Sequence, residues 1–214
     1  MHFLKKNNSL AIVIFTVTLF PLSFFYLDKL YLSWLWEVKT SGSFIYAALD
    51  AIYPVINYAS NGLSFIVIII VFFILGRFFN KRLYETGALL CAGFAVTGIV
   101  AQLLKHLIGR ARPRLTENLI MIGPSWKSGH DSFPSGHTAI AFCFAYILSK
   151  YYPKYKALFY MLAVIVGVGR LKVPSHFLSD VLAGAVVGLL LGKLTTNHFI
   201  PFINRQKTAH HEYS

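Results

Sequence analysis

Long apolar runs with almost no charge constrain this chain more than any other feature. Three such runs extend from Leu10 to Leu27, from Leu63 to Phe79 and from Thr86 to Leu104. A membrane-spanning helix needs roughly 20 apolar residues, because backbone groups that face lipid must be hydrogen-bonded within their own helix. The chain is 56% hydrophobic and only 13% charged, unlike a typical water-soluble domain. The sequence therefore predicts an all-α integral membrane protein.

Three further apolar stretches reach spanning length only when the polar residues at one end are included. They are Thr138–Ser149, Ala157–Gly169 and Val181–Gly192. Polar side chains at membrane depth are costly and usually mark a functional site. We therefore expect a bundle of six transmembrane helices. The expected spans are about 10–27, 63–80, 86–107, 134–150, 155–171 and 176–195.

The remaining segments complete this expected architecture. Residues 28–61 mix aromatic and polar side chains, so we expect an outer helical segment that lies at the membrane interface without crossing it. We expect the run that starts at Leu10 to stay as a span rather than be removed as a signal peptide. The chain has no linker-like stretch, which predicts one membrane domain over residues 1–204 and a cytoplasmic tail at 205–214.

Three glycines recur at four-residue spacing in the last apolar stretch, at Gly184, Gly188 and Gly192. Residues four apart lie on one face of a helix, and small residues there let a second helix approach closely. This strip predicts a helix-packing face.

The net charge of +12 would suggest nucleic-acid binding in a soluble protein, but its placement suggests otherwise. With both termini in the cytoplasm, 11 of the 20 Lys and Arg residues fall on the inner side and 9 on the outer side. The excess of inner over outer cations becomes larger if Lys105, Arg112 and Arg170 serve an outer site. We therefore expect a plasma-membrane or inner-membrane protein with both termini cytoplasmic and a site facing the periplasm or cell exterior. The expected partners are the bilayer and a lipid, without nucleic acid, and the sequence predicts no oligomeric state.

The residues able to carry chemistry form three clusters at the outer ends of the expected spans. The clusters are Lys105 with Arg112 and Pro113; Pro134, Ser135, Gly136 and His137; and Arg170, His176 and Asp180. Together they supply three cations, two histidines and one carboxylate at one membrane face. This set suits attack on a phosphate ester, whose negative charge needs fixed cations.

The histidines can divide the work of such a reaction. His176 and Asp180 are four residues apart, so on a helix the carboxylate could hold one ring nitrogen and leave the other nucleophilic. His137 would remain available as the general acid. Ser135 and Gly136 open a helix, where a hydroxyl and backbone N–H groups favour an anion.

In these clusters the sequence resembles the type 2 phosphatidic acid phosphatase (PAP2) superfamily, which also includes the vanadium haloperoxidases. The shared pattern is a lysine separated by six residues from Arg-Pro, then Pro-Ser-Gly-His, then an arginine, a histidine and an aspartate at the spacing seen here. The resemblance covers residues 105–180 and implies the six-span, metal-independent membrane branch, with no cofactor. It also implies roles for eight residues: His176 as the phosphohistidine nucleophile, Asp180 orienting it, His137 as general acid, and Lys105, Arg112, Ser135, Gly136 and Arg170 as phosphate ligands. Gly169 stands where the family often has serine, which removes one possible hydroxyl contact.

The resemblance implies a bacterial lipid phosphatase that hydrolyses a phosphomonoester or a pyrophosphate lipid. Undecaprenyl pyrophosphate and lipids of the phosphatidylglycerol phosphate or phosphatidic acid type are the expected substrates, and no residue decides among them. A lipid phosphotransferase and a lipid A phosphatase of the same family remain open. So does a non-enzymatic carrier of anionic lipids that would use the same cations.

Overall fold

The computed structural model describes residues 22–116, 118, 120–172 and 175–212, with side chains up to Phe199. The described part is built of helices, and its one β-type pairing is an isolated bridge between Arg110 and Met121. The elements are η2 (Ser23–Leu27), α3 (Asp28–Thr40), α4 (Phe44–Ala59), α5 (Gly62–Phe78), α6 (Lys81–Ile108), α7 (Gly136–Tyr151), η3 (Pro153–Tyr155), α8 (Lys156–Lys172) and α9 (Leu178–Glu212). The all-α prediction is confirmed.

The helices lie where the apolar runs predict them, but the expected count of six spans is not confirmed. Two described helices are long and apolar enough to cross a membrane: α6, and the Leu178–Phe199 part of α9. The pair α4 and α5 adds a third if it counts as one span bent by 53°. Helices α7 and α8 have only 16 and 17 residues, and each carries polar site residues, His137 and Arg170, within its own length. Most of the expected first span, residues 10–21, lies outside the described residues.

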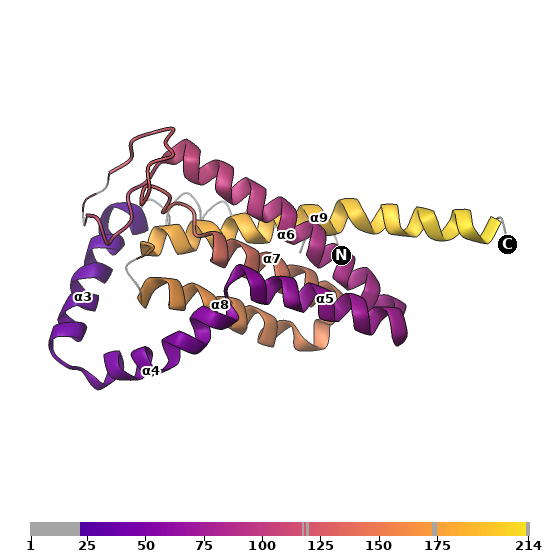
Figure 1. The fold of residues 1–214 in the computed structure, drawn as a ribbon, viewed down its shortest axis with the longest axis horizontal. Helices are drawn as coiled ribbons and strands as arrows, with labels where there is room; N and C mark the ends of the chain where they lie inside the picture. Colours follow the sequence, from indigo (N-terminus) through magenta and orange to yellow (C-terminus); the bar gives the residue numbers. More distant parts are fainter. Residues whose placement is uncertain (1–21, 117, 119, 173–174, 213–214) are drawn as a thin grey trace, which may run out of the picture.

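Helices α5 to α9 form an elongated bundle, with α3 and α4 bowing outward at the end where α8 ends and α9 begins (Figure 1). The buried core lies between α5, α6, α7 and α8. Its buried members are Phe65, Ile69, Leu89, Leu90, Ala141, Cys143, Phe144, Ala145, Ile147 and Ala163. Helix α9 continues past Asn204 without a break and projects beyond the other helices (Figure 1).

The glycine strip of α9 lies against the backbone of α7, as the four-residue spacing predicts. A Cβ atom at Gly184 would lie 2.5 Å from the carbonyl oxygen of Ser135, and one at Gly188 would lie 2.1 Å from that of Ala139. At Gly192 the carbonyl oxygen of Cys143 would be 3.0 Å away. The two helices therefore pack backbone to backbone, which brings the starts of both helices to the same end of the bundle.

A glycine also ends α6 and turns the chain back over the bundle. Gly109 adopts a left-handed conformation with φ of 58°, which is readily available only to glycine. A Cβ atom there would lie 2.1 Å from the carbonyl oxygen of Gly123. The loop that follows α6 can thus fold tightly over the end of that helix.

A buried ion network ties α3 to the start of α9. Arg110 is 1% exposed and pairs with Asp28 at 2.8 Å and with Asp180. Asp28 also accepts hydrogen bonds from the backbone N–H of Ser179, at 2.8 Å, and from its hydroxyl, at 2.6 Å. The Arg110 guanidinium lies over the ring of Phe177, 4.0 Å from its centroid. One arginine therefore holds two buried carboxylates from distant parts of the sequence.

Replacing Gly188 by alanine tests the packing of α7 on α9. We expect Gly188→Ala to lower the free energy of unfolding by about 1–3 kcal/mol, because the added methyl group overpacks a contact made by backbone atoms. Gly98→Ala on α6 is the matched control, since a Cβ atom there meets nothing within 4 Å. Thermal unfolding in detergent measures both variants, and equal midpoints would contradict the packing described.

Replacing Arg110 by leucine tests the ion network. Loss of the arginine leaves Asp28 and Asp180 buried without their shared cation, which we expect to cost about 3–5 kcal/mol of stability. Arg110→Lys should recover only part of this loss, because an ammonium lacks the planar fork that serves both carboxylates. Arg114→Gln changes an exposed cation nearby and should leave the unfolding midpoint within about 1 °C of wild type. A leucine variant as stable as wild type would show that the network contributes nothing.

Candidate active site

The three predicted clusters meet at one end of the bundle, where α6 and α8 end and α7 and α9 begin. The backbone N–H of Ser135 donates to the carbonyl oxygen of Asp180 at 3.0 Å, which joins the second cluster to the third. The N–H of Ser132 donates to the carbonyl oxygen of Arg110 at 3.1 Å, which joins the loop after α6 to the segment before α7. The site is therefore built on backbone contacts between sequence-distant segments.

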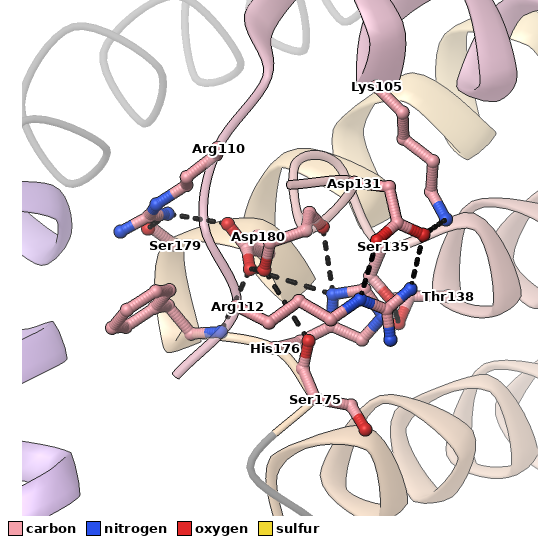
Figure 2. A network of polar contacts seen from close by, with 12 residues as sticks. Lys105, Arg110, Arg112, Asp131, Ser135, Thr138, Ser175, His176, Ser179 and Asp180 are labelled. Carbon is pink, nitrogen blue, oxygen red and sulfur yellow. Dashed lines mark hydrogen bonds and ion pairs between the residues drawn. The ribbon is translucent and has the colours of Figure 1, made fainter. Parts of the chain in front are cut away.

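Lys105 and Arg112 converge on the carboxylate of Asp131 (Figure 2). The Nε and Nη2 atoms of Arg112 donate to its two oxygens at 2.9 Å and 2.6 Å. The Lys105 ammonium lies 4.0 Å from the nearer oxygen. The hydrogen bonds from Arg112 lower the pKa of Asp131 from 3.8 to about 2, so this carboxylate is ionised at neutral pH. The two cations thus share an anion that belongs to the protein.

His176 lies in the non-helical segment just before α9, which begins at Leu178, and its side chain is 3% exposed. Its Nδ1 atom lies 2.8 Å from the carbonyl oxygen of Ser132 and 3.5 Å from Oδ2 of Asp180. The expected pairing on a shared helix face therefore takes a different form, with a carbonyl oxygen as the nearer partner. Because a carbonyl oxygen only accepts, Nδ1 carries the hydrogen, and Nε2 of the neutral ring keeps its lone pair.

Asp180 is fully buried and accepts hydrogen bonds from several directions. Arg110 and the Ser132 hydroxyl donate to its side chain. The backbone N–H of Phe177 donates to Oδ2 at 2.9 Å. Figure 2 shows Arg110 on one side of Asp180 and His176 on the other. An ionised carboxylate is costly to bury without such partners, so this network keeps Asp180 charged beside His176.

The start of α7 faces the same region. The Ser135 side chain accepts from the Thr138 hydroxyl at 2.9 Å and makes no capping hydrogen bond to the backbone of α7. A Cβ atom at Gly136 would lie 3.9 Å from Cε of Lys105. His137 interacts electrostatically with Lys105 and also with three other predicted residues, namely Arg112, Arg170 and His176. The first N–H groups of a helix have no partners within it and favour an anion.

Arg170 is held by the end of α4 and the residue that caps it. Its Nη2 atom donates to Oδ1 of Asn57 at 2.7 Å and to the Ser60 hydroxyl at 3.2 Å. Its Nε atom is buried and has no hydrogen-bond partner among the described residues. A buried donor without a partner is costly, and this one is available to a ligand.

Several residues that complete the geometry were not among the predicted site residues. Asp131 and Arg110 lie within or beside the motifs, and a carboxylate in a loop with several Lys and Arg residues is a signal that sequence reasoning could have used. Ser132 offered less of a signal, because its carbonyl oxygen and its hydroxyl reach His176 and Asp180 only once the loop has folded. Asn57 and Ser60 gave no signal, since they reach Arg170 only through the folding of residues 28–61 onto the bundle.

Comparison with known proteins finds the same family whose motifs the three clusters resemble. The PAP2 superfamily model matches residues 86–201. A lipid A 1-phosphatase of Rhizobium johnstonii is 37% identical over 51% of this chain and 46% of its own length. Phosphatidylglycerophosphatase B of Bacillus subtilis is 34% identical over 60% of this chain and 64% of its own length. This chain therefore spans about half to two thirds of these relatives.

Two solved structures share the fold. The crystal structure of a PAP2-type phosphatidylglycerolphosphate phosphatase from Bacillus subtilis superposes with a TM-score of 0.61 at 25% identity, covering 88% of this chain and 94% of that one. The crystal structure of Aquifex aeolicus LpxE gives a TM-score of 0.56 at 27% identity, covering 71% and 87%. The family model accounts for more than half of the sequence and includes all three clusters, so this integral membrane protein belongs to the PAP2 superfamily.

Proposed function

We propose that this protein is a metal-independent lipid phosphatase in which His176 attacks phosphorus and forms a phosphohistidine. The observation that carries the proposal is the state of His176. Its ring is buried, Nδ1 is engaged by the carbonyl oxygen of Ser132 beside the charged Asp180, and Nε2 is left with its lone pair. An orienting group on one nitrogen is the usual way to prepare the other as a nucleophile.

The surrounding cations support binding of the scissile phosphate next to His176. Lys105 supplies a point charge, and the guanidinium groups of Arg112 and Arg170 supply forked donors. The unpaired Nε of Arg170 and the N–H groups at the start of α7 are available for phosphate oxygens. Ser135 and Gly136 belong to that helix start. These donors would neutralise the charge that develops on the equatorial oxygens during transfer.

The proposed reaction has two steps. First, Nε2 of His176 attacks phosphorus in line, the bond from phosphorus to the lipid oxygen breaks, and His137 gives that oxygen a proton. Second, water attacks the phosphohistidine, His137 accepts a proton from the water, and the phosphorus–nitrogen bond breaks to release inorganic phosphate. Asp180 keeps the His176 ring oriented and balances its positive charge during both steps.

The names of the relatives support a phosphorylated lipid as the substrate class. We propose undecaprenyl pyrophosphate or a lipid of the phosphatidylglycerol phosphate or phosphatidic acid type. We further propose that both termini are cytoplasmic and that the site opens to the opposite face. The distribution of Lys and Arg supports this orientation, with 11 residues on the inner side against 6 on the outer side once Lys105, Arg112 and Arg170 are set apart.

Replacing His176 by alanine tests the proposed nucleophile. We expect phosphate release from a panel of phosphorylated lipids in detergent, with EDTA present, to fall by at least about 10³-fold, because no covalent intermediate forms. His106→Ala is the matched control. Its ring hydrogen-bonds to the carbonyl oxygen of Ser125 at 3.0 Å and stacks on Trp126, outside the proposed machinery. Turnover that survives in the His176 variant, or that disappears with EDTA in wild type, would overturn the mechanism.

Replacing Asp131 by asparagine tests the role of the resident anion. Asp131→Asn keeps the shape of the contact but removes a negative charge that Lys105 and Arg112 now share. We therefore expect vanadate and inorganic phosphate to inhibit the variant at concentrations several-fold lower than wild type, since the cations attract an incoming anion more strongly. Glu37→Gln, at an exposed carboxylate of α3, should change inhibition little. Weaker inhibition of the Asp131 variant would show that the carboxylate acts mainly by orienting Arg112.

A further inference from the structure

A basic cavity lies beside two of the segments that carry the candidate site. It has a volume of about 390 Å³ and is bounded by α3, the first turn of α4, the loop 113–116 and the end of α8. Its lining starts at Pro113, directly after Arg112, and includes Lys172, two residues after Arg170. Two of the proposed phosphate ligands, Arg112 and Arg170, therefore lie within two residues of the cavity lining in the sequence.

The charge of the cavity is positive. Lys39, Arg114 and Lys172 line it, and none of the described residues in its lining carries a carboxylate. Lys172 is 9% exposed, pairs with Asp50 and lies 5.3 Å from the ring centroid of Tyr46. Arg114 is exposed, so its guanidinium is accessible to a ligand. Because Asp50 pairs with Lys172, the described lining keeps Lys39 and Arg114 as the cations for an anionic group.

The other walls of the cavity are apolar and aromatic. Leu32 and Leu35 are buried along one side, and Trp36 and Tyr46 line the cavity beside the cations. The Lys39 ammonium lies 5.2 Å from the ring centroid of Trp36. A free phosphate ion would fill little of this volume and would gain nothing from the apolar wall. A larger group that carries both charge and carbon surface fits better.

We propose that this cavity binds the part of the lipid headgroup that lies beyond the scissile phosphate and carries a second negative charge. The inference rests on the proposed function, because it assumes that a lipid phosphate occupies the site beside His176. It assigns a preference to the enzyme: lipids whose headgroup bears a second anionic group bind better than phosphatidic acid, which has one phosphate. Lys39 and Arg114 contact the second charge, and Trp36 contacts the carbon skeleton between the two charges.

Steady-state kinetics with two substrates of identical acyl chains test this preference. Phosphatidylglycerol phosphate carries the second charge and phosphatidic acid does not. In mixed micelles, the Lys39→Gln/Arg114→Gln variant should show a KM for phosphatidylglycerol phosphate raised by roughly tenfold, as expected for lost charge-assisted contacts. Its kcat for that substrate, and its KM for phosphatidic acid, should stay within about twofold of wild type.

Lys127→Gln is the matched control, because Lys127 is an exposed cation between α6 and α7 that does not line the cavity. It should leave both KM values unchanged. An equal rise of KM for both substrates in the double variant would show only general attraction to an anionic micelle and would overturn the proposal. An unchanged KM for phosphatidylglycerol phosphate would overturn it as well.

A binding measurement keeps this test separate from the proposed reaction. The chain has three tryptophans, so Trp34→Phe/Trp126→Phe leaves Trp36 as the single reporter in the cavity wall. Titration with deacylated phosphatidylglycerol phosphate should change its fluorescence at concentrations at which inorganic phosphate does not. An equal response to inorganic phosphate would identify an unspecific anion site, and no response to the headgroup would contradict the cavity assignment. Either result stands whether or not His176 proves to be the nucleophile.

Discussion

The buried carboxylate of Asp180 is the constraint on which the described site depends. An isolated charge of this kind is among the most costly groups to bury, and here it is fully buried. It is stabilised by Arg110 from the loop after α6, by the Ser132 hydroxyl from the segment before α7, and by the N–H of Phe177. Each donor comes from a segment that carries part of the site. The hydrogen bonds to the Asp180 carboxylate therefore hold the segments that carry the three clusters next to one another.

Close backbone packing makes that arrangement possible. The glycine strip of α9 lets α7 approach until Ser135 donates to the carbonyl oxygen of Asp180. A bundle held apart by larger side chains would separate the helix start of α7 from His176. Two kinds of contact thus build the site. Close packing of α7 on α9 brings the residues near one another, and the ion network orients their side chains. Neither would suffice alone, because the polar groups need both partners and exclusion from water.

Sequence patterns predicted the starts of α5 to α9 to within five residues, because apolar runs and the polar residues that flank them are local signals. They did not predict the length of α9, which continues to Glu212, 17 residues beyond the expected span that ends at 195. They also predicted that the three clusters meet at one end of the bundle. The patterns did not predict that Ser132 would be the nearer partner of His176, nor that Asp131 would occupy Lys105 and Arg112. Such contacts depend on how loops fold. The number of spans is harder to predict than the helices themselves, because α7 and α8 are short and the pair α4 and α5 is bent.

The bend between α4 and α5 has a consequence for how this site varies in evolution. It lies at Ser60, which with Asn57 holds the guanidinium of Arg170. Neither position belongs to a motif, so a motif search does not detect changes there. A substitution at either one would redirect Arg170 while every motif residue stayed the same. Family members with identical motifs can therefore differ in the geometry of this arginine, and comparisons between them need to include positions 57 and 60.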